Sequence, residues 1–256
     1  MPPSLMDHTD RFTGRAGAYA QGRPGYPPAV LELLAQETRR ESPRLADIGS
    51  GTGILSRAML ERGWTVYGVE PNADMRREAE LSLKDFPSFH SIPGTAEHTF
   101  LPSGSVDMVA AAQAFHWFDA ATFKQECRRI LAREGRVALL WNSRLEDSPI
   151  VREEGNIHRL YCPRFYGFSG GLAELADRIG EFFDHRFRIF RFPNDLAYTR
   201  EQYLRRMMST SYALMEKDEQ RSAWLDTLNG LFDRFETDGR VTVPNETVVY
   251  VGGRRG

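Results

Sequence analysis

Short apolar runs alternate with helical patterns through the first 141 residues of the chain. The apolar runs have the length expected of strands that are covered on both faces of a sheet. They lie at residues 45–48, 65–70, 106–112 and 137–141, with a further candidate at 90–93. Helical spacing of apolar side chains separates them, at residues 52–62, 73–84 and around 123–131. Strands that alternate with helices predict an α/β fold with a doubly wound parallel sheet.

The pattern changes after residue 141. Helical patterns follow at residues 150–161, 172–183 and about 220–235. The run "HRFRIFRF" predicts a strand near 185–192, and "ETVVYVGG" predicts a last one. No repeat or low-complexity linker interrupts the chain, so we expect one domain, 1–256. Its expected parts are a ligand-binding core at 40–142, an N-terminal segment at 1–39, helical additions at 143–240 and a final strand at 241–256.

Composition limits the setting of the protein and its partners. The formal net charge is −2 and the arginines are scattered, so nothing favours a nucleic-acid partner. No apolar run approaches the ~20 residues of a membrane helix, and "MPPSLMDHTD" lacks the order of a secretion signal. The two cysteines, Cys127 and Cys162, have neither metal-ligand nor disulfide spacing. We therefore expect a cytoplasmic protein with no membrane partner and no metal.

A glycine-rich loop follows the first predicted strand in "LADIGSGTGILSRAML", residues 45–60. Gly49, Gly51 and Gly53 lack Cβ atoms, so the backbone can turn sharply and approach a ligand closely. Ligands of open α/β sheets bind beyond the carboxyl ends of the strands, where this loop is expected to lie. A dinucleotide fingerprint would place its third glycine at position 54, where an isoleucine stands. The loop therefore predicts a bound small molecule and disfavours NAD.

Glu70 ends the second predicted strand, in "VYGVEP". A carboxylate at this place can accept hydrogen bonds from both hydroxyls of a ribose, and it repels a 2′-phosphate, so NADP is disfavoured further. The alternative is a tight turn followed by an exposed glutamate. The strand–turn–helix context of the glycine loop favours ligand binding over that alternative.

Four stretches together resemble the class I S-adenosylmethionine-dependent methyltransferases: "DIGSGTG", "GVEPNADM", "GTAEHTFLPSGSVDMV" and "AAQAFHWFD". The likeness is greatest to the branch that contains trans-aconitate methyltransferase, which "AYAQGRPGYP" and "MSTSYALM" also resemble. The resemblance implies a Rossmann-like seven-stranded sheet and S-adenosyl-L-methionine as the cofactor. It also implies transfer of a methyl group to a small-molecule acceptor, with a carboxylate as one candidate.

The resemblance further implies which residues bind the cofactor, and all fall at carboxyl ends of predicted strands, as the fold rule requires. Those expected along the methionine moiety are Asp47, Gly49, Ser50 and Gly51. Glu70 is expected at the ribose, with Pro71 and Met75 beside the adenine. Those expected at the adenine edge are Thr95, Ala96 and Glu97, although many such enzymes carry an aspartate where Thr95 stands. Those expected near the amino group and the sulfonium are Ala112 and Gln113.

A glycine- and proline-rich segment at residues 10–26 precedes the core. We expect it to fold over the cofactor as a lid, with Arg23 as a cofactor-binding residue that meets a carboxylate and Tyr19 as a substrate-binding residue. A surface turn followed by an amphipathic helix is the alternative.

Methyl transfer from a sulfonium requires alignment and in some cases a base, but no metal. His116 follows the fourth predicted strand, and the ordinary imidazole pKa of about 6.5 suits proton removal from a hydroxyl or amine. Alternatively His116 orders a loop or binds substrate without titrating in the reaction, since a carboxylate acceptor needs no base. Trp117 and Tyr212 are the expected substrate-binding residues. Arg205 and Arg206 either anchor an acidic acceptor or form the solvated edge of a helix.

Rival functions differ in what the sequence should contain. Base-methylating enzymes carry an N/D-P-P-aromatic stretch where this chain has "AQAF", and the Pro-Cys order of cytosine C5 enzymes is absent, since Cys162 precedes Pro163. The near-neutral charge does not favour a polyanion. A small-molecule methyltransferase is therefore favoured over an enzyme acting on a macromolecule. A non-catalytic S-adenosylmethionine-binding protein and an NAD oxidoreductase are also compatible with a glycine loop in this position.

Overall fold

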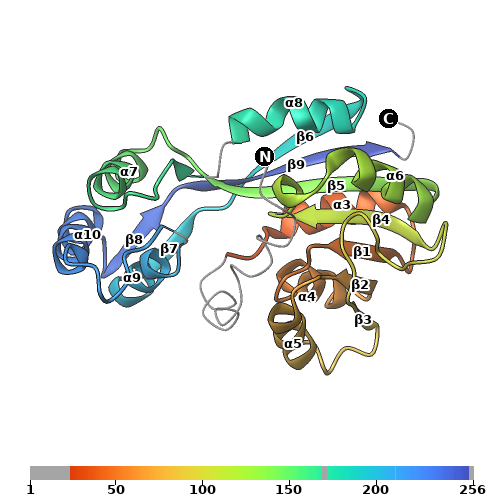
Figure 1. Ribbon diagram of the computed structural model, residues 1–256, viewed down its shortest axis with the longest axis horizontal. Helices are drawn as coiled ribbons and strands as arrows, with labels where there is room; N and C mark the ends of the chain where they lie inside the picture. The colour runs from red at the N-terminus through yellow and green to blue at the C-terminus, as the bar shows by residue number, and fades with distance from the viewer. Residues whose placement is uncertain (1–23, 169–171, 211, 254–256) are drawn as a thin grey trace.

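A seven-stranded sheet forms the centre of the computed structural model, which describes residues 24–168, 172–210 and 212–253 (Figure 1). The strand order is β3-β2-β1-β4-β5-β9-β6. The strands are β1 (Arg44–Ile48), β2 (Thr65–Val69), β3 (Phe89–Ile92), β4 (Val106–Ala112), β5 (Leu131–Arg144), β6 (Phe187–Pro193) and β9 (Asn245–Gly253). β1 to β5 are parallel, whereas β9 is antiparallel to both of its neighbours. The alternating pattern of the sequence thus predicted the sheet correctly.

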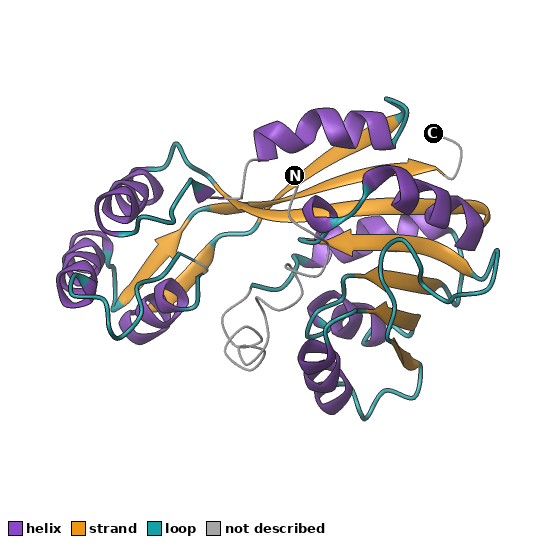
Figure 2. Ribbon diagram, in the orientation of Figure 1, coloured by secondary structure: helices purple, strands orange, loops and turns teal. Residues whose placement is uncertain are grey.

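Helices cover both faces of this sheet (Figure 2). α6 (Ala120–Ile130) and α8 (Leu172–Phe182) pack on one face, where Phe123, Cys127 and Ile130 are buried as their spacing predicted. α3 (Pro28–Thr38) and α4 (Ile54–Leu60) pack on the other face, and α5 (Ala73–Ser82) lies beside α4. Along β4, alternate side chains enter the two apolar cores, because successive residues of a strand point to opposite faces.

A second lobe lies beyond the carboxyl ends of the parallel strands (Figure 1). It contains α7 (Pro149–Tyr161), α9 (Arg200–Met208), α10 (Arg221–Phe235) and a two-stranded sheet of β7 (Leu196–Thr199) and β8 (Arg240–Val243). α10 contributes Trp224, Leu228, Leu231 and Phe232 to its core. The helical spacing of the sequence predicted this buried face.

The structure adds to the expected layout and changes its last part. Besides helices and the strand expected near 185–192, the additions at 143–240 contain β7 and β8, which form their own antiparallel ladder. The segment 241–256 is not one strand, because β8 ends at Val243 and β9 begins at Asn245. The strand expected among the additions is β6, which joins the edge of the main sheet. Four-residue strands and a half-exposed edge strand carry too little apolar pattern to be assigned to a sheet from sequence.

The described residues contain neither a membrane-spanning helix nor a cluster of metal ligands. None of the helices there is long and apolar enough to cross a membrane. Within the same residues, no three His, Cys, Asp or Glu side chains are grouped to hold a metal ion.

Candidate functional site

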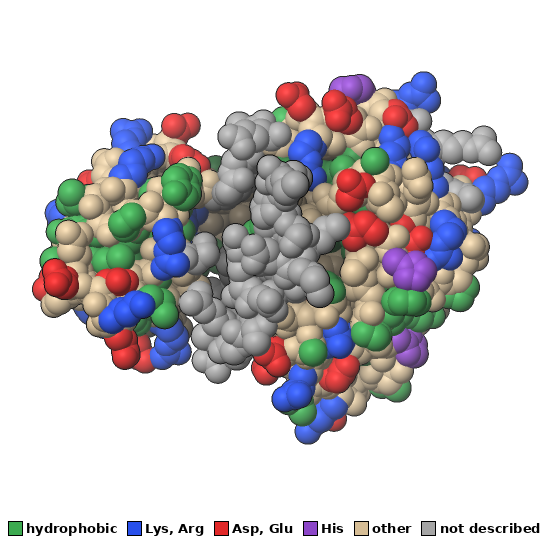
Figure 3. Space-filling view, in the orientation of Figure 1, with side chains coloured by type: hydrophobic (Ala, Val, Ile, Leu, Met, Phe, Trp, Pro, Cys, Tyr) green, Lys and Arg blue, Asp and Glu red, His purple; other side chains and the backbone are tan. Residues whose placement is uncertain are grey.

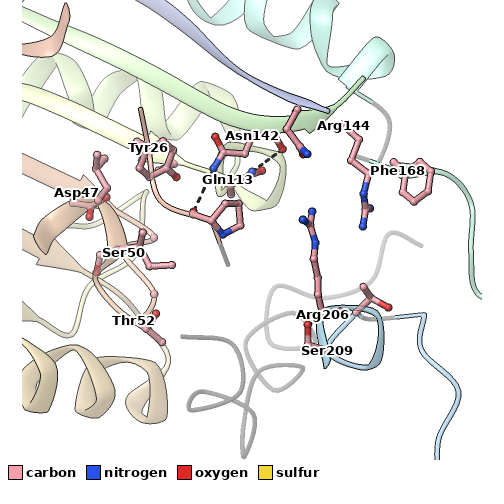
Figure 4. A pocket seen from close by; sticks show the side chains of 18 residues that line it. Tyr26, Asp47, Ser50, Thr52, Gln113, Asn142, Arg144, Phe168, Arg206 and Ser209 are labelled. Atoms are coloured by element: carbon pink, nitrogen blue, oxygen red, sulfur yellow. Dashed lines mark hydrogen bonds between the residues drawn. The ribbon is translucent and has the colours of Figure 1, made fainter. Parts of the chain in front are cut away.

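A pocket of about 180 Å³ lies where the carboxyl ends of β1, β4 and β5 face the second lobe (Figure 4). The core contributes Asp47, the loop at 49–52 and the residues that follow β4. The second lobe contributes the end of α9 and the residues after it. The full lining is Pro24, Tyr26, Asp47, Gly49, Ser50, Gly51, Thr52, Ile54, Leu55, Ala112, Gln113, Asn142, Arg144, Phe168, Arg206, Ser209, Thr210 and Asn245.

The glycine loop needs its glycines for different reasons. Gly49, Gly51 and Gly53 have φ values of 67°, 56° and 83°, the left-handed region that disfavours other residues. A Cβ on Gly49 would lie 2.7 Å from the Cβ of Ala114, so packing also excludes a side chain there. A Cβ on Gly51 would meet no heavy atom within 4 Å. Gly51 therefore leaves open space in the pocket that a ligand can use.

Asp47 presents a buried carboxylate to the pocket. Its Oδ2 accepts a hydrogen bond of 2.7 Å from the Ser56 hydroxyl, whereas its Oδ1 has no partner among the described residues. The Thr52 hydroxyl also lines the pocket. It is buried and has no hydrogen-bond partner among the described residues. Burial raises the pKa of Asp47 to about 6, and the Ser56 hydrogen bond opposes that rise. Because buried polar atoms are normally hydrogen-bonded, these atoms indicate a polar ligand.

Asp47→Asn is expected to stabilise the ligand-free protein by about 3 kcal/mol at pH 7.5. Because the folded protein keeps the Asp47 proton to a higher pH than the unfolded chain does, wild-type stability falls as the pH rises from about 4 to about 6. Asparagine has no such loss. Chemical denaturation between pH 4 and pH 7.5 measures the difference, which should grow over that interval and then level off.

Asp107→Asn serves as the control for this substitution. Burial opposes the ionisation of Asp107, but its hydrogen bonds from Arg44 outweigh burial and lower the pKa of the carboxyl. Replacing the carboxylate by an amide at position 107 should therefore destabilise the protein. Equal stability of wild type and Asp47→Asn at pH 7.5 would contradict the assignment of a strained, ionised Asp47.

Glu70 lies directly after β2 and is bonded to the glycine loop. Its Oε2 accepts from the backbone N–H of Gly51 at 3.0 Å, and its Oε1 accepts from that of Asn72 at 2.9 Å. Burial raises the pKa of Glu70, and these two N–H groups oppose the rise. Each carboxylate oxygen has a second lone pair for a hydroxyl donor. Glu70 therefore has a role that the sequence did not predict, which is to fix the position of Gly51.

The remaining residues expected around the adenine lie at the neighbouring strand ends, outside the pocket lining. Met75 and Ala96 are buried, Glu97 is half-buried, and Pro71 and Thr95 are exposed. Glu97 accepts a hydrogen bond of 3.0 Å from the backbone N–H at the start of α6. The roles of these five residues stay predictions.

Of the residues expected near the reacting groups, some line the pocket and others lie outside its lining. Ala112 and Gln113 line the pocket, and the Gln113 side-chain N–H donates to the Asn142 carbonyl at 3.0 Å. His116 and Trp117 lie on the short 3₁₀ helix Phe115–Trp117, with ring centroids 4.6 Å apart, and neither belongs to the lining. Tyr212 is half-buried outside the lining, and burial raises the pKa of its hydroxyl.

Only the last residues of the expected lid are described. Pro24 and Tyr26 line the pocket, and the Asn142 amide donates to the Gly25 carbonyl at 3.2 Å. Tyr19 and Arg23 lie outside the described residues, so their roles stay predictions.

Among the lining residues that were not predicted from the sequence are Asn142, Arg144, Phe168 and Asn245. A signal was available for Asn142 and Arg144, because both follow the run at 137–141 and so stand at the carboxyl end of a strand. Of the two arginines left open, Arg206 lines the pocket, whereas Arg205 is exposed and pairs with Glu201.

Comparisons with known sequences identify the central part of the chain. Residues 46–139 match the family model described as a methyltransferase domain. The chain is 40% identical over 157 residues to an uncharacterized methyltransferase of Mycobacterium tuberculosis, an alignment that covers 61% of this chain and 62% of that protein. It is 26% identical over 242 residues to an uncharacterized methyltransferase of Schizosaccharomyces pombe, with 91% and 92% covered. Residues 46–139 are therefore similar to a methyltransferase domain.

Solved structures share the fold. One from Anaeromyxobacter dehalogenans, named as a type II methyltransferase, superposes with a TM-score of 0.63 at 23% identity and covers 91% of this chain and 98% of its own. A Haemonchus contortus phosphoethanolamine N-methyltransferase, solved with phosphomonomethylethanolamine and S-adenosylhomocysteine, gives 0.53 at 15% identity and covers 99% and 61%. The predicted Rossmann-like α/β fold is thus confirmed.

Proposed function

We propose that this protein is an S-adenosylmethionine-dependent methyltransferase that acts on a small molecule. One observation carries the proposal. Within the residues that match the methyltransferase model, the Gly51 N–H donates to Glu70 at the edge of a pocket. That pocket also contains the Asp47 oxygen that has no partner among the described residues. The Glu70 carboxylate suits a ribose, the glycine loop and Asp47 suit an amino-acid tail, and the rest of the pocket leaves room for an acceptor. On its motifs, we also place the chain in the branch that contains trans-aconitate methyltransferase.

The residues of the pocket fit this cofactor, together with Glu70, which lies outside the lining and is bonded to Gly51. Glu70 has lone pairs for the ribose hydroxyls, the bare backbone at Gly49 and Gly51 can follow the methionine moiety, and Asp47 can accept from its ammonium group. When bound, S-adenosylmethionine supplies a methyl group on a positively charged sulfur. The protein aligns an acceptor with that methyl, which is the main requirement of an in-line displacement.

A small acceptor agrees better with the pocket and the surface than a polyanion does. The second lobe closes one side of the pocket, which limits the size of an acceptor. On the face shown in Figure 3, outside the grey region, Lys and Arg side chains are interspersed with Asp and Glu, with no continuous basic patch. Binding of nucleic acid depends on such a patch.

Ligand titration and a donor screen test the proposed function. S-adenosylmethionine and S-adenosylhomocysteine should bind, and NAD should not. A radiolabelled methyl donor should then label at least one pool of small carboxylates, phenols or amines. Preferential binding of NAD would support an oxidoreductase instead, and donor binding without label transfer to any pool would support a non-catalytic binding protein.

His116→Ala tests whether a base takes part. If the acceptor is a hydroxyl or amine, we expect kcat to fall by about 100-fold, while the affinity for S-adenosylhomocysteine stays within about twofold. A carboxylate acceptor has no proton to lose, so its methylation should not depend on His116. Unchanged kcat with a hydroxyl or amine acceptor from the screen would remove His116 from the chemistry.

A further inference from the structure

Two arginines from distant parts of the chain enter the same end of the pocket. Arg144 is the last residue of β5, and Arg206 lies on α9 of the second lobe. Figure 4 shows their guanidinium groups directed toward each other, across the pocket from Asp47 and the glycine loop. The pocket therefore has an acidic end near Asp47 and a basic end at the two arginines.

Arg144 is held in place before any ligand binds. Only 10% of its side chain is exposed, and its Nη2 forms an ion pair with Oε1 of Glu154, 2.9 Å away. Its Cζ lies 4.3 Å from the centre of the Phe168 ring. Burial opposes the ionisation of Glu154, but Arg144, His158 and Arg206 together outweigh burial and lower the pKa of Glu154. The Tyr203 hydroxyl donates to the other Glu154 oxygen at 3.2 Å, so the ion pair is itself fixed.

Arg206 is positioned by an aromatic neighbour. Its guanidinium donates to the Tyr198 hydroxyl, and its Cζ lies 5.0 Å from the centre of that ring. Tyr198 is on β7, which packs against α9. Both guanidinium groups are thus oriented by protein contacts, which lowers the entropy lost when they bind a ligand.

We propose that Arg144 and Arg206 form an anion-binding subsite for a carboxylate or phosphate group of the acceptor. A guanidinium presents a planar fork of donors that matches both groups. An anion between the two arginines also offsets the repulsion of two like charges placed near each other. That the anion belongs to the acceptor rests on the proposed function, which places the cofactor at the other end of the pocket.

The anion held there is an anchor and not the group that is methylated. In the transfer, an electron pair of the acceptor forms the bond to the methyl carbon while the carbon–sulfur bond breaks and its electrons stay on sulfur. A methylated anion loses its negative charge in this step. Two guanidinium groups would stabilise that anion more before the reaction than in its transition state, and so slow it. The acceptor therefore carries two groups, an anchoring anion and a separate nucleophile nearer Gln113.

Calorimetry with inorganic phosphate and with succinate tests the subsite in protein saturated with S-adenosylhomocysteine. Arg206→Gln should weaken the better of the two probes by about tenfold or more, the loss expected for a charge-assisted hydrogen bond. Arg206→Lys keeps the charge and loses the planar fork of donors. Its affinity for the probe should lie between those of the wild type and Arg206→Gln. Arg205→Gln is the matched control, since Arg205 is on the same helix and outside the lining. The better probe identifies the anchor as phosphate or carboxylate.

Arg144→Lys is the second variant, because Arg144→Gln would leave Glu154 buried without its charged partner. It should weaken the same probe while leaving S-adenosylhomocysteine binding unchanged. Propionate has one anionic group and no second nucleophile. It should compete with the acceptor found in the donor screen without receiving a methyl group itself.

Three results would overturn the subsite: no binding of either probe to the wild type, equal probe affinity in Arg206→Gln and wild type, or weakened S-adenosylhomocysteine binding in Arg206→Gln. The last would assign the arginine to the cofactor. Methylation of propionate would overturn the anchoring role. Failure of the proposed function would be seen separately, as a wild type that does not bind S-adenosylhomocysteine at all.

Discussion

Gly51→Leu is expected to lower the affinity for S-adenosylhomocysteine by at least about 100-fold, or about 2.7 kcal/mol, while the protein still folds. No heavy atom lies within 4 Å of a Cβ built on Gly51, so the side chain has room in the ligand-free protein. That room is part of the pocket, where the methionine moiety is proposed to lie. Leucine would fill it, and binding would require its displacement.

Gly63→Leu is the matched control for this variant. Gly63 lies in the turn after α4, has a φ of 79°, and also has no heavy atom within 4 Å of a built Cβ. Both substitutions force a leucine into the left-handed region at about 1–2 kcal/mol. The two variants should therefore lose similar unfolding free energy, and only Gly51→Leu should lose binding in calorimetry. Wild-type affinity in Gly51→Leu would show that the cofactor does not follow this loop.

The sheet and the buried helix faces were predictable because their signals are local. A strand covered on both faces is almost continuously apolar, as at residues 108–112 of β4 and in the middle of β5. A helix on such a sheet must repeat its apolar residues at helical spacing, as Phe123, Cys127 and Ile130 do on α6. β7 and β8 lacked such a signal, because four residues of alternation occur by chance in many loops.

The candidate site was predictable only in its core half. Asp47, the glycine loop and Gln113 stand beside strand ends, where the fold rule directs attention. Arg144, Phe168, Arg206 and Asn245 come from four separate segments. The antiparallel pairing of β5 with β9 sets Arg144 opposite Asn245, and the packing of α7 supplies Glu154. Such long-range pairing leaves no periodic trace in the sequence, so only the structure shows that Arg144 and Arg206 share one end of the pocket.

The hydrogen bond between Glu70 and Gly51 means that one carboxylate serves two purposes. It can accept from the ribose, and it holds the N–H that orients the loop along the rest of the cofactor. A side chain with both tasks should be more sensitive to change than one that only contacts a ligand. Shortening or neutralising it removes acceptor atoms and also frees the backbone whose position the pocket depends on.

Glu70→Ala is therefore expected to weaken S-adenosylhomocysteine binding by about 100-fold or more, since two hydrogen bonds to a charged acceptor are lost. Glu70→Gln keeps one acceptor oxygen, so its affinity for S-adenosylhomocysteine should lie between those of the wild type and Glu70→Ala. Asp107→Ala is the control, because Asp107 also accepts a backbone N–H, that of Arg44 at 3.0 Å, but at the opposite end of the sheet. Both alanine variants should lose stability, and calorimetry should find weakened binding in Glu70→Ala alone. Equal affinity of Glu70→Ala and wild type would remove Glu70 from the ribose, whereas a matching loss in Asp107→Ala would show a general effect of destabilisation.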